Sequence, residues 1–207
     1  MDAQTIWQCN LSSIQVSVNG GQTWQSTGQG GNYCIMSFVD AKTGWLLKSG
    51  TIELTTDGGQ SWNEVTLPEG GKDIGAISLR TASEGYVLTP DGVLHKTQDG
   101  GNSWSSVTLD LTKYGQMQFL PATDPGYPPS VAIRFFDADH GVIVMSLVGS
   151  GSSKIVAFRT ADSGQTWTEE AVPATIGTLY LTHDGQYLTV SSILEAKKVT
   201  VLRYTGE

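Results

Sequence analysis

The amino-acid sequence predicts an all-β protein, a β-propeller built from four-stranded antiparallel blades. An eight-residue motif occurs four times along the chain, and a second motif precedes three of its copies. The composition agrees, because the 207 residues include 25 glycines and only 15% are charged. Many glycines and few charges suit short strands that are joined by tight turns.

The eight-residue motif, called the box below, reads [S/T]-x-[D/N]-x-G-x-[S/T]-W. It contains four of the six tryptophans. The four copies are Ser17–Trp24, Thr55–Trp62, Thr97–Trp104 and Thr160–Trp167. The first two intervals between copies have the length of a propeller blade. The third interval is longer because of two insertions, at 111–130 and 149–153.

The residue types in the box predict a structural hairpin between the third and fourth strands of a unit. The acid or amide side chain can accept backbone N–H groups within the turn, and the glycine can adopt a positive φ. The tryptophan can pack between neighbouring units. We therefore expect structural roles for Asn19, Gly21, Trp24, Asp57, Gly59, Trp62, Asp99, Gly101, Trp104, Asp162, Gly164 and Trp167. Ser163, where the other boxes have glycine, leaves the turn type of the fourth box open.

The second motif marks the first strand of each unit and the turn that follows it. The segments Ile35–Gly44, Ala76–Gly85 and Ala132–Gly141 align without gaps, and each ends in A-x-x-G. In the second unit, further strands are expected at Gly44–Leu47, Thr51–Thr55 and Trp62–Leu67.

The repeats divide one propeller domain, residues 1–207, into about five units. Their expected bounds are 5–28, 33–68, 75–110, 131–173 and 176–205. The first unit lacks a first strand and the last lacks a fourth. The chain is therefore either a five-bladed ring with two three-stranded blades or a piece of a larger propeller.

The strand Gly44–Leu47, the hairpin Thr51–Trp62 and the A-x-x-G turns make the chain resemble BNR/Asp-box repeat propellers. It is most similar to the photosystem II stability/assembly factor family, and the resemblance covers nearly all of 5–204. Sialidases, sortilin-type receptors and some xyloglucanases carry the same box. The resemblance implies a non-enzymatic binding module that engages a protein partner, such as a membrane-complex subunit awaiting assembly.

Charge and hydropathy narrow the classes of partner. The formal net charge is −8 and no basic run occurs, so a nucleic-acid partner is not expected. No apolar run has the length of a membrane span, so direct membrane insertion is not expected either. Met1–Thr5 shows no signal-peptide features. We nevertheless expect an extracytoplasmic protein.

No cofactor or catalytic motif is recognisable, and neither a catalytic residue nor a metal site is expected. His95, His140 and His183 lie in different units without metal-ligand spacing. The alternative is a carbohydrate-active or sugar-binding propeller, because scattered carboxylates can pair in space. A third possibility is a structural segment of a larger surface protein.

Four residues are candidates for partner binding. Tyr114, Phe119 and Tyr127 lie in the proline-rich insertion at 111–130, where a stiff loop presents aromatic side chains at low entropic cost. The alternative is a loop folded onto its own scaffold. Arg134 stands where the expected first strands of the second and third units have a serine. Its guanidinium could hold an anionic partner or pair with a nearby carboxylate.

The two cysteines, Cys9 and Cys34, are either a disulfide or two buried thiols. Cys9 falls on the second strand of the first unit, and Cys34 begins the first strand of the next. These are inner strands of adjacent blades, so the side chains could meet. We expect the bridge if the protein is exported.

Overall fold

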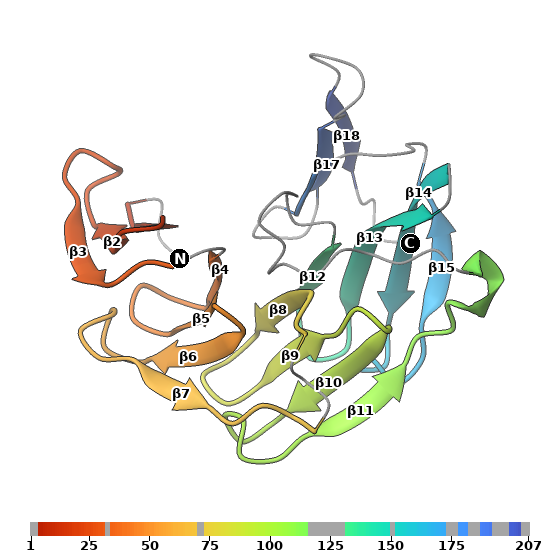
Figure 1. Ribbon diagram of the computed structural model, residues 1–207, viewed down its shortest axis with the longest axis horizontal. Coiled ribbons are helices and arrows are strands. Elements are labelled where there is room, and N and C mark those ends of the chain that lie inside the picture. Colours follow the sequence, from red (N-terminus) through yellow and green to blue (C-terminus); the bar gives the residue numbers. More distant parts are fainter. Residues whose placement is uncertain are drawn as a thin grey trace.

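The strands in the described part of the chain form five antiparallel sheets that follow one another in sequence order. The computed structural model describes residues 4–31, 34–69, 73–115, 131–149, 152–172, 178–181, 187–191 and 199–203. Three sheets have four strands, and the first and last have three. Figure 1 shows the sheets side by side along an arc, from red to blue. The predicted propeller of four-stranded antiparallel blades is confirmed.

We number the sheets as blades 1 to 5. Blade 1 contains β1 (Ile6–Cys9), β2 (Ile14–Ser17) and β3 (Gln25–Gly28). Blade 2 contains β4 (Cys34–Phe38), β5 (Gly44–Lys48), β6 (Thr51–Thr55) and β7 (Asn63–Val65). Blade 3 contains β8 (Ala76–Leu79), β9 (Gly85–Leu88), β10 (Val93–Thr97) and β11 (Ser105–Thr108).

Blade 4 contains β12 (Val131–Phe135), β13 (Gly141–Gly149), β14 (Ser152–Thr160) and β15 (Thr168–Ala171). Blade 5 contains β16 (Thr178–Leu181), β17 (Tyr187–Ser191) and β18 (Val199–Arg203). A short 3-10 helix, η1 (Thr112–Tyr114), follows β11. No helix within the described ranges has the length and apolarity needed to cross a membrane.

Two details differ from the sequence-based expectation. The fourth strand of blade 2 was expected to run Trp62–Leu67 but spans only Asn63–Val65. The Gly/Ser insertion at 149–153 follows a lengthened strand pair, and its residues 150 and 151 lie outside the described residues. The strands β13 and β14 stay paired up to Gly149 opposite Ser152.

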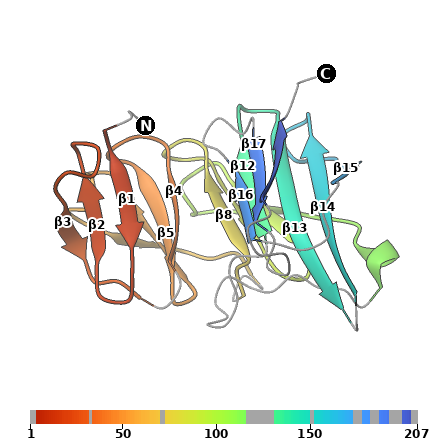
Figure 2. The ribbon, with the colours of Figure 1, turned by 90° about the horizontal axis from the view of Figure 1, so that it is seen from above.

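The core lies between the blades, where apolar faces of neighbouring sheets meet. The largest buried cluster joins blades 3 and 4, and a second joins blades 2 and 3. The inner strands form a row, since β4 contacts β8, β8 contacts β12, and β12 contacts β16. Figure 2 shows the blades stacked one behind another when they are seen from above. Each blade thus buries its apolar residues against the next blade.

Aromatic side chains occupy the same place at three successive interfaces. Trp7 stacks on Phe38 with ring centroids 4.3 Å apart, and Tyr86 stacks on Phe135 at 3.6 Å. At the interface between them, the rings of Trp45 and Trp104 lie 6.1 Å apart. Trp7 on β1, Trp45 on β5 and Tyr86 on β9 occupy equivalent positions. Each directly follows the residue that pairs with the first residue of the box. Blade 4 has Val142 in that column.

A disulfide joins blade 1 to blade 2. Cys9 ends β1, Cys34 begins β4, and their Cα atoms lie 5.9 Å apart. The chain between the two cysteines includes the whole of β2 and β3. The bridge therefore ties the first blade to the first four-stranded blade.

Gly85→Ala should destabilise the fold by about 1–3 kcal/mol, the usual cost of overpacking a tight core. An added Cβ at this position would collide with the ring of Trp45, which is fully buried. Urea denaturation followed by tryptophan fluorescence measures the effect. Gly28→Ala is the control, because its Cβ would lie 3.2 Å from the end of the Ile14 side chain and no closer than 3.8 Å to Trp62. Equal stability of the two variants would contradict the packing argument.

Removing the disulfide with Cys9→Ser and Cys34→Ser together should lower the free energy of unfolding by about 3 kcal/mol, since the closed loop spans 25 residues. Reductant should lower the melting temperature of the wild-type protein and leave that of the double variant unchanged. Mass spectrometry of the non-reduced protein gives a direct check. Two freely alkylatable thiols in protein purified from an oxidising compartment would refute the bridge.

Candidate functional site

The boxes build closed networks of hydrogen bonds within their own hairpins. In the second box, the Thr55 hydroxyl donates to Asp57 Oδ1 at 2.9 Å and accepts the N–H of Gly59 at 2.8 Å. Asp57 also accepts the backbone N–H of Ser61 at 2.9 Å and its hydroxyl at 2.6 Å. The third and fourth boxes repeat these bonds around Asp99 and Asp162.

These bonds fix the charge state of the box carboxylates. The hydroxyl and then the backbone N–H of Ser61 lower the pKa of Asp57 to about 2. Corresponding donors, led by Ser103 and Thr166, lower the pKa of Asp99 and that of Asp162 to about 2 as well. In the first box Asn19 takes the same position, and its Oδ1 accepts the N–H of Thr23 at 2.9 Å.

Each of the last three boxes is also tied to the A-x-x-G turn of its own blade. The N–H of Gly58 donates to the Lys42 carbonyl at 2.9 Å, and the N–H of Gly100 donates to the Ser83 carbonyl at 2.8 Å. Ser163 makes the equivalent bond to Asp139 at 3.0 Å and adopts a φ of 62°. The fourth box therefore keeps the hairpin of the others without its first glycine.

Of the candidate residues for partner binding, the two that the structure describes, Tyr114 and Arg134, lie apart. Tyr114 lies in η1, packs against the core of blades 3 and 4, and has Lys113 and Lys154 within 5.3 Å and 5.0 Å of its ring centre. Both lysines pair with Glu169. Arg134 lies on the inner strand β12, opposite Val142, whereas η1 lies at the outer edge of the blades (Figure 1). Phe119 and Tyr127 lie outside the described residues.

Tyr114 is thus part of the scaffold at the start of the insertion. Burial raises the pKa of its phenol. The ring packs on the core and is flanked by two paired lysines, so the described contacts of Tyr114 are with its own scaffold. A role in partner binding stays a prediction.

The histidines make local contacts. His95 is buried on β10, its Nδ1 lies 2.8 Å from the Ser106 hydroxyl, and burial lowers its pKa. His140 contacts Asp137, four residues before the end of its A-x-x-G turn, at 3.0 Å. His183 lies outside the described residues. Where the structure places side chains, no three His, Cys, Asp or Glu residues gather as metal ligands.

A small charged cluster lies between blades 3 and 4 on the side of the boxes. Glu84 accepts hydrogen bonds from Arg80 and from the Tyr86 hydroxyl, and Lys96 approaches it to 3.4 Å. Burial alone would raise the pKa of Glu84. The bonds from Arg80 and Tyr86 outweigh burial and hold the pKa below its ordinary value.

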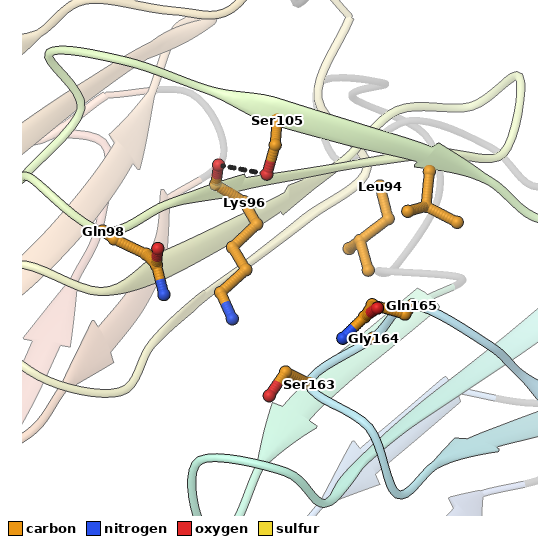
Figure 3. Close-up of a pocket in the computed structure, with 8 residues that line it drawn as sticks. Leu94, Lys96, Gln98, Ser105, Ser163, Gly164 and Gln165 are labelled. Atoms are coloured by element: carbon orange, nitrogen blue, oxygen red, sulfur yellow. Dashed lines mark hydrogen bonds between the residues drawn. The ribbon is translucent and has the colours of Figure 1, made fainter.

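A pocket of about 320 Å³ adjoins this cluster. Figure 3 shows Lys96, Gln98 and Ser105 on the side of blade 3, with Ser163, Gly164 and Gln165 from the fourth box facing them. Lys96 is already paired with Glu84. The lining therefore offers hydrogen-bonding groups around a neutralised cation, and it contains no carboxylate that could act on a substrate.

An apolar patch on blade 1 is the functional candidate that the sequence-based reasoning missed. It consists of Ile6, Val18 and Trp24, which are 40%, 70% and 38% exposed. Ile6 and Trp24 both lie beside Gly21, and Ile6 pairs with Ser17, the neighbour of Val18. The sequence contained one sign of this patch. When the four boxes are aligned, the large apolar Val18 stands at the position of Thr56, Gln98 and Ala161.

The exposure of Trp24 has a structural cause. The tryptophans of the second and third boxes pack against rings of the preceding blade, Trp62 against Trp7 and Trp104 against Trp45. Within the described residues no ring lies against Trp24. Trp24 is thus 38% exposed, and the patch that it forms with Ile6 and Val18 is a candidate surface for a partner among the described residues.

Comparison with known families identifies the chain. The family model for photosynthesis system II assembly factor YCF48 matches residues 21–195. The chain belongs to this family. The resemblance seen in the boxes and A-x-x-G turns is thereby confirmed. No curated protein sequence matches the chain.

Solved structures with a similar fold include other members of the YCF48 family. A structure of YCF48 bound to D1 peptide is 14% identical, with a TM-score of 0.47, over 91% of this chain and 85% of that one. YCF48 from Cyanidioschyzon merolae is 14% identical, with a TM-score of 0.46, over 90% and 88%. An ancestral GH74 enzyme is 16% identical, with a TM-score of 0.53, over 92% of this chain and 26% of the enzyme. At this identity, the likeness to the enzyme concerns the fold alone.

Replacing Asp57, Asp99 and Asp162 together by asparagine should preserve the hairpins near neutral pH. In the first box Asn19 accepts the Thr23 N–H and its amide donates to the Thr23 hydroxyl, so the same two groups stay bonded with the hydroxyl bond reversed. It should also remove part of the acid sensitivity. A carboxylate whose pKa falls from 3.8 to about 2 on folding stabilises the protein above its ordinary pKa, and that contribution is lost as pH falls through the folded value.

Urea midpoints measured from pH 6 down to pH 2 test this, with Asp57→Ala as the comparison. The alanine variant leaves the Ser61 donors unpaired and should melt lower at every pH. An identical pH dependence in the wild-type and the triple asparagine variant would show that the box carboxylates do not carry the effect.

Proposed function

We propose that this member of the YCF48 family is a non-enzymatic propeller that binds a protein partner during assembly of a membrane complex. Membership of an assembly-factor family supports a protein partner. The box carboxylates support a non-enzymatic role, because each is already engaged by several donors within its own turn. The GH74 enzyme shares the fold, and hydrolysis of a polysaccharide by the purified protein would contradict this part of the proposal.

The observation that carries the proposal is the apolar patch of Ile6, Val18 and Trp24. Large apolar side chains in solvent favour association, and a tryptophan at the centre of such a patch is a frequent hot spot of protein interfaces. The patch lies on a blade that the disulfide fixes to blade 2. A rigid surface binds a partner with little loss of conformational entropy.

We also propose that the protein works in an oxidising, extracytoplasmic compartment. The disulfide between Cys9 and Cys34 supports this, because such bridges persist mainly outside the reducing cytosol.

The experiment is site-specific photo-crosslinking in the native cell. Benzoylphenylalanine at Val18 should give a discrete adduct with a subunit of a membrane complex, identified by mass spectrometry. The matched control is the same group at Glu64, an exposed residue on β7 of the neighbouring blade. Adding Trp24→Ser should reduce the Val18 adduct by about tenfold, the loss typical of a hot-spot tryptophan. Identical adducts at both positions, or an adduct insensitive to Trp24, would overturn the assignment of the patch.

A further inference from the structure

The junction between blades 2 and 3 shows how a box closes against the preceding blade. A Cβ added to Gly101 would collide with a methyl group of Val65 on β7. The Trp104 indole N–H crosses the same junction and donates to the Thr66 carbonyl at 2.9 Å. The third box is therefore in close contact with the outer part of blade 2.

The junction between blades 3 and 4 is more open at the equivalent place. In the repeat, Val107 takes the position of Val65. A Cβ added to Gly164 would have its nearest neighbours at 3.3 Å or more, and none of the three nearest atoms belongs to Val107. The Trp167 indole N–H donates to the Gly164 carbonyl of its own hairpin, at 3.0 Å, instead of crossing to blade 3. The pocket of about 320 Å³ occupies this opening.

One wall of the pocket is a face of the hairpin β10–β11, and its character changes along the strands. Leu94 pairs with Val107, and Lys96 pairs with Ser105. Gln98 follows two residues after Lys96, so alternate residues present an aliphatic pair, a polar pair and an amide on one face. Figure 3 shows Lys96 and Gln98 at one end of the pocket and Leu94 at the other. A ligand with an aliphatic stem and a polar head matches this order.

The polar half of the wall distinguishes blade 3 from blade 2. Lys96 takes the position of Leu54 in the repeat, and Gln98 takes that of Thr56. Leu54 packs against the buried cluster that joins blades 2 and 3. The polar side chains thus coincide with the open junction, and the apolar one with the closed junction.

The charges around the pocket favour a neutral head group. Lys96 lies 3.4 Å from Glu84, and the Ser163 hydroxyl donates to Asp139 at 3.0 Å. An incoming carboxylate would approach these two acidic side chains. An incoming ammonium would approach Lys96 and Arg80, which also binds Glu84. Because like charges repel at short range, a neutral head group meets the smaller penalty.

The Gln98 amide selects among neutral head groups. It makes no hydrogen bond to the residues that the structure describes, so one acceptor and two donor hydrogens remain to be satisfied. A second primary amide can pair with it through two hydrogen bonds, one in each direction. An apolar ligand would cover these groups without bonding them, which costs free energy. Among the lining residues there is no aromatic ring on which a sugar could stack.

We propose that the pocket between blades 3 and 4 binds a primary-amide side chain of the protein partner. Its aliphatic carbons would lie on Leu94 and Val107, and its amide would pair with Gln98. Glutamine, with two methylene groups, matches the length of the wall better than asparagine does. The inference rests on the proposed function in one respect, because it takes the partner to be a protein.

The test is an NMR titration of the purified protein with capped amino acids. N-acetylglutamine N-methylamide should bind with a dissociation constant of about 1 mM, as expected for so small a ligand, and should shift the signals of Lys96, Ser105 and Gln165. The corresponding glutamate, lysine and leucine compounds share its backbone and should bind at least about threefold more weakly. The glycine compound has no side chain and should leave these signals unshifted, which separates side-chain from backbone recognition.

Gln98→Glu keeps the size of the side chain and removes its amide hydrogens. Binding of the glutamine compound should weaken about three- to tenfold, and the fold should be unaffected because Gln98 is exposed. Gln29→Glu, the same change at an exposed residue between β3 and β4, is the control and should bind like the wild type.

Three results would overturn the proposal. They are equal binding by the wild type and Gln98→Glu, binding of the glutamate or glycine compound as tight as that of the glutamine compound, and no shifts at the lining residues. A partner crosslinked at Val18 without binding of the glutamine compound would sustain the proposed function and refute the amide pocket. Binding of this compound without a crosslink would sustain the pocket and count against the patch on blade 1.

Discussion

Aromatic contact between neighbouring blades is the interaction on which the rest of the molecule depends. A four-stranded sheet with two apolar faces is stable only when another sheet covers those faces. Trp7 on Phe38, Trp45 beside Trp104, and Tyr86 on Phe135 provide this cover at three successive interfaces. Glycines at 44, 85 and 141 make room for these rings or for their partners. The blades are therefore stable as a series and not one at a time.

The polar boxes serve the same packing. Their hydrogen bonds fix the hairpin and so fix the place where the following tryptophan enters the interface. Trp104 shows the coupling, since its indole N–H donates to the Thr66 carbonyl of the preceding blade at 2.9 Å. Conserving the box within one chain therefore maintains blade spacing, and the surfaces between and beside the boxes are left to carry function.

The repeated part of the fold was predictable because the chain contains several copies of the same motifs, which can be aligned with one another. Four boxes and three A-x-x-G turns located the blades, and the first-strand columns gave the register. The proposed partner surface was not predictable in the same way. Tyr114 is aromatic and in an insertion, but its packing on the core depends on Lys154 and Glu169, far along the chain. Trp24 has the same sequence context as Trp62, and only the arrangement of neighbouring sheets reveals that it is exposed.

The place where the aromatic column stops affects how the molecule comes apart. Val142 follows Trp7, Trp45 and Tyr86 in this column, so the interface beyond blade 4 begins from a smaller, aliphatic side chain. In a row of units held by nearest-neighbour contacts, opening starts at the weakest junction. The three aromatic junctions therefore join blades 1 to 4 into one series, and this column of rings ends at Val142.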